Sequence, residues 1–290
     1  SLNDLKVAQE DKDSLRNIYT ELEFKTWLEP DNSVKNIQKK EEKKYDLIVN
    51  EKSLRKWVKR LEKSSLIALD TETDGLDYMD VNLVGISFSV KPWEAAYIPL
   101  GHKNEQQLPL SLIVSELKPI LESKKPKIIG QNIKFDKHIL KRFGINISSI
   151  KNDTMLMSYV LNSTATRHNL DSLAQFYLDY KTITFEEVAG KGIKQLTFDQ
   201  IPLAKASYYA SEDADTTLRL YKALKFRLSK EPKLKTLLQD IEIPLVGVLS
   251  DMEHAGTLVN KNVLQAQSRD FERRISSLEE SAYQLAGQEF

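Results

Sequence analysis

Residues 66–75, LIALDTETDG, carry the most informative pattern in the chain, because four apolar residues run directly into a set of carboxylates. A short apolar run of this kind is typical of a buried β-strand. Side chains alternate between the faces of a strand, so Asp70 and Glu72 are expected to point the same way. Two carboxylates at the end of a strand supply the oxygen ligands that hard divalent cations such as Mg²⁺ prefer. Taken alone, this pattern favours a simpler interpretation, an acidic strand end in solvent.

A second segment with a carboxylate follows the short apolar strand expected at residues 127–130. Asp136 lies in the first turns of a helix expected over about 133–143, and Asn132 lies just before that helix. In isolation these two residues fit simpler roles, because an acidic residue offsets the helix dipole and an asparagine caps a helix N-terminus.

A third segment combines a phenol with a carboxylate. Tyr209 and Asp213 are four apart in a helix expected over about 203–229, so they share one helix face. Alone, the pair fits a partly buried tyrosine beside a surface aspartate. In combination, the four acids of the three segments would repel and raise one another's pKa. Two divalent ions about 3.5–4 Å apart relieve that repulsion and form a two-metal site for phosphodiester cleavage.

The other elements place these segments in an α/β fold. Further strands are expected at residues 82–90 and 95–100, close to the first one. Strands that come early and helices that come late predict a sheet flanked by helices and not a regular βαβ repeat. Other helices are expected around Leu54, Val58 and Leu61 and at residues 110–122, 153–162, 169–178, 233–255 and 261–287.

The composition is that of a globular protein with about two domains. The chain has 290 residues, with 42 basic and 42 acidic side chains, which excludes a globally basic nucleic-acid coat but not a local basic patch. It has no cysteine, which excludes a disulfide scaffold, a thiol nucleophile and a thiolate-held metal. No apolar run approaches the ~18–20 residues of a membrane span, so no membrane partner is expected.

The three motifs, Asp70-Thr71-Glu72, Asn132 to Asp136 and Tyr209 to Asp213, have the order and spacing seen in DEDDy-type 3′–5′ exonucleases. Over about residues 45–230 the chain resembles the proofreading domain of the family A polymerases, the bacterial DNA polymerase I family. This resemblance implies an RNase H-like (DnaQ-like) mixed sheet flanked by helices. It also implies an enzyme that removes nucleotides from DNA 3′ ends as 5′-monophosphates, in DNA replication and repair. The segments that carry it are LIALDTETDGL, NLVGISFSV, AAYIPL, GQNIKFDKHIL, DTMLMSYVLNS, RHNLDSLA, KTITFEEVAGKG and YYASEDADTTL.

The resemblance also implies the residues of the site. Asp70, Glu72 and Asp213 would hold one divalent cation, and Asp70 would also hold a second, to which Asp136 contributes through bound waters. The ions would be Mg²⁺, with Mn²⁺ or Zn²⁺ possible. Glu72 and Tyr209 would orient the attacking water, because a phenol with a pKa near ~10 is a poor base at neutral pH.

The implied substrate is a single-stranded DNA 3′ end, and the implied product is a nucleoside monophosphate. Leu76 would wedge between the terminal bases and Phe185 would stack on a base. Phe135 stands where a tyrosine is common in the family. A monomer in the bacterial cytoplasm, associated with the nucleoid, is expected. The residues implied to hold the strand are Gln131, Asn132, Phe135 and Arg167.

Four segments are expected along the chain. Residues 1–29 resemble the end of the family's 5′-nuclease domain, 30–44 a linker, 45–230 the exonuclease domain, and 231–290 the incomplete start of the polymerase domain. The polymerase motifs of the family are absent from these 290 residues, so the chain itself is not expected to polymerise DNA.

Two alternatives remain open. One is a non-catalytic DNA-binding or scaffolding module on the same fold, which would have lost the acids that this chain retains. The other is an RNA-directed exonuclease of the RNase D kind, against which the polymerase-like flanks argue.

Basic residues around the second motif allow two interpretations, a positive field suited to a phosphate backbone or a solvated helix face. The four histidines show no ligand spacing and are interpreted as structural or surface residues. The basic residues are Lys124, Lys125, Lys127, Lys134, Lys137, Lys141 and Arg142.

Overall fold

The computed structural model describes residues 11, 14–15, 18–19, 42–103 and 105–290. The chain divides into two units, residues 1–42 and 43–290, and the account below concerns the second. Most of the tail predicted over 1–29 and most of the linker predicted over 30–44 lie outside the described residues.

A six-stranded mixed sheet with the order β1-β4-β3-β2-β5-β6 forms the centre of the second unit. Strand β2 is antiparallel to β3 and parallel to β5, and β1 is parallel to β4. The strands are β1 (Lys44–Leu47), β2 (Leu66–Thr73), β3 (Leu83–Lys91), β4 (Glu94–Pro99), β5 (Lys127–Gly130) and β6 (Ile150–Asp153).

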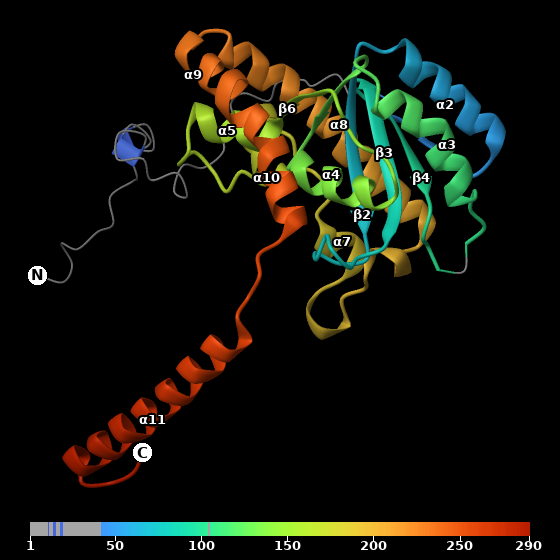
Figure 1. The fold of residues 1–290 in the computed structure, drawn as a ribbon. Helices are drawn as coiled ribbons and strands as arrows, with labels where there is room; N and C mark the ends of the chain where they lie inside the picture. Colours follow the sequence, from blue (N-terminus) through green and yellow to red (C-terminus); the bar gives the residue numbers. More distant parts are fainter. Residues whose placement is uncertain (1–10, 12–13, 16–17, 20–41, 104) are drawn as a thin grey trace, which may run out of the picture. The chain divides into compact units, whose positions relative to one another are not determined.

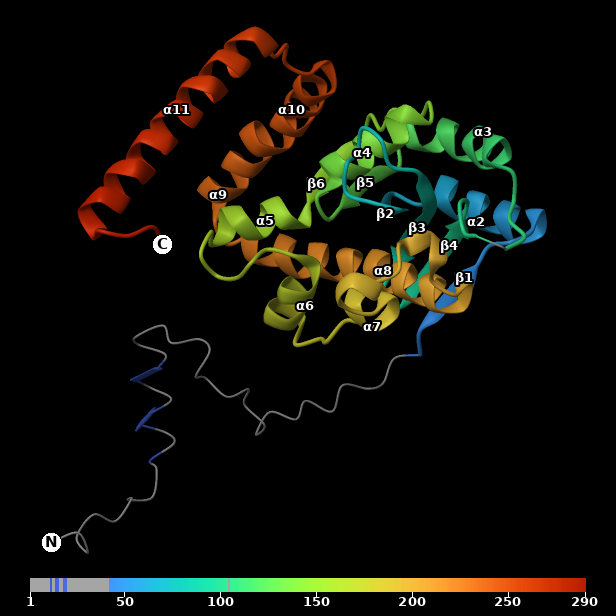
Figure 2. The ribbon, with the colours of Figure 1, turned by 90° about the horizontal axis from the view of Figure 1, so that it is seen from below.

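Helices cover both faces of this sheet (Figures 1 and 2). Helix α8 (Leu203–Leu228) packs across β1 to β5 on one face, together with α5 (Thr154–Leu161) and α6 (Leu170–Leu178). Buried residues of the other three helices, α2 (Glu51–Lys63), α3 (Leu110–Leu121) and α4 (Ile133–Arg142), form a core with the opposite face.

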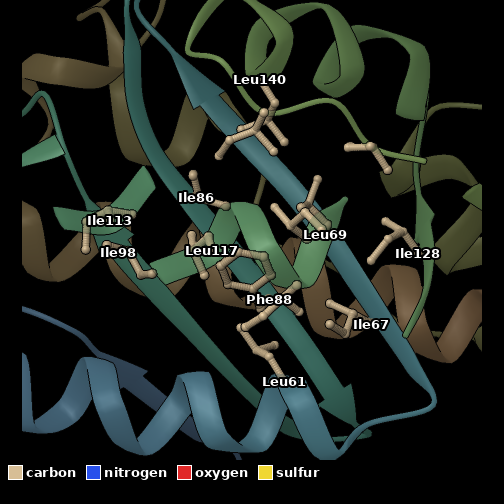
Figure 3. Packing of buried hydrophobic residues seen from close by; sticks show 14 of the residues in the cluster. Leu61, Ile67, Leu69, Ile86, Phe88, Ile98, Ile113, Leu117, Ile128 and Leu140 are labelled. Carbon is tan, nitrogen blue, oxygen red and sulfur yellow. The ribbon is translucent and has the colours of Figure 1, made fainter. Parts of the chain in front are cut away.

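The alternation of side chains along β2 explains the two layers. Ile67 and Leu69 are fully buried in the core beneath α2, α3 and α4, where Phe88 and Leu117 join them (Figure 3). Ala68, on the opposite face, packs with residues of α8 such as Leu224. Asp70 and Glu72 follow the parity of Ala68, so β2 directs both carboxylates toward α8.

Three local expectations needed correction. Strand β2 extends to Thr73, so Asp70 and Glu72 lie within it, because pairing with β3 continues past the apolar run. Strands β1 and β6 were not predicted, since KYDL and IKND are short and mix polar with apolar residues. The helix expected at 233–255 is divided by a π-turn over Leu238–Glu242 into α9 (Pro232–Leu237) and α10 (Ile243–Ala255).

The C-terminal helices extend beyond the sheet layers. Helix α10 packs against α4, and its Val246 is buried in the same core as Ile139. Helix α11 (Lys261–Ala286) follows, and α7 (Phe185–Ala189) is a short helix ahead of α8. Among the described residues, no helix is both long and apolar enough to cross a membrane.

Candidate active site

Strand β2 and helix α8 bring three carboxylates together. Asp70 and Glu72 from β2 and Asp213 from α8 each offer an oxygen atom, and these atoms lie within 4.8 Å of one another. Asp213 is only 8% exposed, so the simpler interpretation of it as a surface residue is wrong. The i, i+2 spacing on a strand and the inward face of a long helix therefore produce one acidic cluster.

The cluster is electrostatically unfavourable in the absence of a cation. Burial raises the pKa of Asp70 to about 7. Burial and then the neighbouring Asp70 and Asp213 raise the pKa of Glu72 well above its usual value. Glu72 Oε1 is buried and has no hydrogen-bond partner. Oxygen donors crowded in this way, one of them unsatisfied, fit a hard divalent cation.

Asp136 is held beside Asp70 but outside this set of three. Its Oδ1 accepts hydrogen bonds from Thr71 N at 2.8 Å and from Thr71 Oγ1 at 2.6 Å. Burial and then the charge of Asp70 raise its pKa, against the opposing effect of the Thr71 bonds. One oxygen of Asp136 is thus bound to the strand that carries Asp70 and Glu72.

Tyr209 lies one helical turn before Asp213, and its hydroxyl opposes the rise in the Asp213 pKa that burial and Asp70 cause. Burial and then the charges of Asp213 and Glu72 raise the pKa of Tyr209 itself. The hydroxyl therefore stays protonated at neutral pH and is available as a hydrogen-bond donor. The Tyr209 ring meets Phe185 edge-on, with 6.2 Å between centroids.

The role of Asn132 as a simple N-cap is wrong. Asn132 adopts a left-handed conformation with φ of 60° and its side chain makes no capping bond. Asp153, at the end of β6, accepts instead from Asn132 N at 3.2 Å and Ile133 N at 2.8 Å. It also accepts from Met155 N at the start of α5. One buried carboxylate thus fixes the first turns of both α4 and α5.

The residues expected to contact DNA differ in exposure. Leu76 is 91% exposed and Phe185 is 36% exposed, and Asn132 and Arg167 are exposed too. The structure brings Phe185 to Tyr209, whereas no described contact joins Leu76 to the acids.

Gln131 and Phe135 are half-buried. The Gln131 side chain donates to His168 O at 2.8 Å and accepts from the Thr154 hydroxyl. These bonds connect the start of the second motif to the loop that carries Arg167.

Four of the seven basic residues near the second motif contact neighbouring elements. Lys134 and Lys141 pair with Glu253 and Asp251 of α10, and Lys137 donates to Asn146. Arg142 donates to backbone carbonyls of the loop after β2. These residues serve packing between elements, which only the tertiary structure reveals.

Two residues next to the acids were not singled out from the sequence. The hydroxyl of Tyr97 on β4 is buried, and Asp70 and Glu72 help to raise its pKa. Gly85 on β3 lies opposite Glu72 on β2 and leaves room for the Tyr97 ring. A Cβ added at Gly85 would lie 2.0 Å from the Tyr97 hydroxyl oxygen. Glycine within a strand is the available sequence signal for such a close approach. Asp171 on α6, which accepts from Thr182 Oγ1 at 2.6 Å, raises the pKa of Asp213.

The family comparison assigns this mixed sheet, with its acids between β2 and α8, to the class of 3′–5′ exonucleases. The model of a 3′–5′ exonuclease family matches residues 45–229. The chain belongs to this family, as the 3′–5′ exonuclease domain of the bacterial DNA polymerase I group.

The relatives agree with this assignment. The chain is 44% identical to a DNA polymerase I of Pseudomonas aeruginosa, over 100% of its own length and 33% of the relative. It is 36% identical to a DNA polymerase I of Rhizobium leguminosarum, over 82% of its own length and 25% of the relative. The chain thus spans a third or less of these relatives.

Solved structures confirm the RNase H-like fold expected from the sequence. The polymerase domain of Pol1 from M. smegmatis, in complex with DNA primer-template and dNTP, has a TM-score of 0.63 at 20% identity, covering 85% of this chain and 38% of that one. Brucella melitensis NrnC has a TM-score of 0.53 at 18% identity, covering 74% and 93%.

Proposed function

We propose that this exonuclease shortens single-stranded DNA from the 3′ end and releases 5′-monophosphate nucleotides. The observation that carries the proposal is the set of three acids whose oxygen atoms lie within 4.8 Å of one another, together with the buried and unpartnered Glu72 Oε1. Asp70, Glu72 and Asp213 would hold one divalent cation, and Asp70 with Asp136 a second. Mg²⁺ is the first candidate, since a solved structure of Brucella melitensis NrnC contains bound Mg²⁺. Mn²⁺ and Zn²⁺ are the alternatives.

The cations would supply charge neutralisation at the reacting phosphate and a lower pKa for water. The chain's own residues then position the reactants. Tyr209, kept protonated by its surroundings, donates a hydrogen bond and orients the attacking water. Glu72 carries an oxygen without a hydrogen-bond partner, which would help to hold the cation or the water. Asp136, fixed by Thr71, keeps its second oxygen available.

The exposed apolar residues suit a strand end without base-specific contacts. Leu76 would separate the terminal bases and Phe185 would stack on one of them, an interaction that tolerates every base. Gln131, Asn132, Phe135 and Arg167 would hold the sugar-phosphate chain. Selectivity for mispaired ends would follow from the need for several unpaired nucleotides to reach the acids.

The longer relatives suggest the setting of this activity. We infer that residues 231–290 open a polymerase domain and that a longer parent chain would be a DNA-directed DNA polymerase in replication and repair. The structurally similar Pol1 of M. smegmatis was solved in complex with DNA primer-template. A monomer in the bacterial cytoplasm, near the nucleoid, fits this role.

A degradation assay tests the proposal. A 5′-labelled single-stranded DNA should shorten from its 3′ end with Mg²⁺ or Mn²⁺, and EDTA should stop the reaction. The Asp70→Asn, Glu72→Gln double variant should lose activity, while Glu62→Gln on the exposed face of α2 should not. Full activity of the double variant would falsify the assignment of the site. No cleavage by the wild-type chain would favour the scaffolding alternative, and faster cleavage of a matched RNA would favour the RNA-directed one.

A further inference from the structure

The loop over residues 74–82, between β2 and β3, carries the exposed Leu76. Its base is closed by Asn82, which donates through its backbone N to Asp74 Oδ1 at 2.7 Å and through its side chain to Oδ2 at 2.8 Å. Inside the loop, Asp77 accepts hydrogen bonds from Met79 N and Val81 N and closes a turn. Contacts from outside the loop add to these bonds.

Helix α4 supplies those contacts. Arg142 donates to Tyr78 O at 3.1 Å and to Val81 O at 2.6 Å. The His138 ring stacks on the Tyr78 ring, with 4.2 Å between centroids and 16° between planes. The loop is therefore held by its backbone at one point and by an aromatic stack at another.

Helix α10 fixes the histidine of this stack. His138 Nε2 hydrogen-bonds Glu253 Oε2 at 2.9 Å, and the His138 side chain is 2% exposed. A carboxylate can only accept, so Nε2 carries the hydrogen. His138 Nδ1 is buried without a partner, so Glu253 is the only described group that sets the ring's orientation by a hydrogen bond. Lys134 pairs with the same carboxylate and adds to its hold on α4.

We propose that Glu253 is a positioning residue for the exonuclease reaction. Through His138 and Tyr78 it holds the loop that presents Leu76 to the DNA end. The inference rests on the proposed role of Leu76 in binding DNA. Its consequence is that α10, which lies in the segment after the exonuclease domain, contributes to substrate binding without touching substrate (Figure 1).

In the competing explanation, the contacts of Glu253 only hold α10 against α4 and have no effect on the loop. Asp251 provides the matched control, because it also joins α10 to α4, by a 3.1 Å pair with Lys141, but has no described contact with His138 or Tyr78. If these contacts only hold α10 in place, the effect of a Glu253 substitution on KM should not depend on Leu76.

Steady-state degradation of single-stranded DNA by the 290-residue chain tests the proposal. Glu253→Ala and Tyr78→Ala should each raise KM by about 5-fold, the effect of one lost hydrogen bond or packing contact, with kcat changed less than about 2-fold. Asp251→Asn should leave both constants unchanged. Glu253→Gln, whose amide oxygen can still accept from Nε2, should restore the wild-type KM.

Dependence on Leu76 decides between the two explanations. In a Leu76→Ala background, Glu253→Ala should cause no further rise in KM, because residues acting through one another are not additive. The same 5-fold rise in that background, or an unchanged KM in the single variants, would overturn the proposal. If Glu253→Ala fails to fold, the Tyr78→Ala and Leu76→Ala pair makes the same comparison. Absence of cleavage by the wild-type chain would instead refute the proposed function.

Discussion

The carboxylates of the site are crowded together and partly withdrawn from water, so the metal-free protein holds them at a cost. The shared direction of Asp70 and Glu72 was predictable from their i, i+2 spacing on a strand, and their meeting with Asp213 was expected from the family resemblance. Which carboxylate oxygens stay without a hydrogen-bond partner could not be predicted from the sequence. The Thr71 bonds to Asp136 and the unpartnered Glu72 Oε1 depend on atoms that only the folded chain brings together.

Asp70 should make the metal-free protein less stable at higher pH. Its folded pKa of about 7 lies above the unfolded value near ~3.9, so the folded state binds the extra proton between them and stability falls as pH rises through this window. At pH 8 in EDTA, Asp70→Asn should therefore be more stable than wild type by about 1–4 kcal/mol, and by less at pH 5. Urea unfolding at both pH values measures this, with Glu62→Gln as the control. A variant less stable than wild type at pH 8 would contradict the prediction.

Removing only the hydroxyl of Tyr209 should impair the reaction without impairing binding. Tyr209→Phe keeps the ring that contacts Phe185 but loses the donor beside Asp213. We expect kcat to fall about 10- to 100-fold, with KM changed little. Because burial and the acids raise the tyrosine's pKa, the wild-type pH profile should show no rise from its ionisation up to pH 9. An unchanged kcat would remove Tyr209 from the catalytic residues.

At the scale of elements, the strands and helices that place the acids follow from the sequence pattern, and the connections between them do not. Apolar runs and helical periodicity revealed β2, β5, α4 and α8. The capping role of Asp153 was not predicted, because it accepts hydrogen bonds from residues 20 and 21 positions away in the sequence. The position of Tyr97 beside the acids was not predicted, because it depends on the register between β3 and β4, which places the ring against Gly85.

Gly85→Ala should disturb the site through Tyr97. The added Cβ would lie 2.0–2.3 Å from the ring and hydroxyl of Tyr97, which is fully buried and cannot move freely. Overpacking of this kind costs about 1–3 kcal/mol, and displacement of the ring toward Glu72 should also reduce cleavage. Gly247→Ala on α10 is the matched control, since nothing lies within 4 Å of its added Cβ and it should be neutral or stabilising. Thermal unfolding that ranks the two variants in the opposite order would contradict this account.

Asp153→Ala should weaken two helices at once. The carboxylate caps α4 through Asn132 and Ile133 and caps α5 through Met155, and each lost cap costs about 1–2 kcal/mol. We expect a loss of about 2–4 kcal/mol in urea unfolding and weaker cleavage, because α4 carries Asp136. Asn169→Ala, which removes the single cap of α6, should cost about half as much. Equal losses would show that Asp153 does not serve both helices.

At the scale of the whole molecule, the acids come from β2, α4 and α8, which are far apart in the chain. Only the folded protein brings their oxygens together, so a cation should bind the folded state and not the unfolded one. The pairs between α4 and α10 have the same character, because Lys134 and Glu253 are 119 positions apart. Two of the basic residues near the second motif, Lys134 and Lys141, are therefore paired in the folded chain with acids that lie far away in the sequence.

Cation binding should consequently stabilise the whole second unit, not only the site. At a Mg²⁺ concentration of about 100 times the dissociation constant, ligand linkage adds about 2.7 kcal/mol to the free energy of unfolding. The melting temperature should rise with Mg²⁺ or Mn²⁺ and fall back with EDTA, when measured by circular dichroism of the helices. Asp213→Asn should abolish this shift, because it removes the only ligand that α8 contributes to the three-acid cluster. The same shift in that variant would place the cation elsewhere and separate metal binding from these acids.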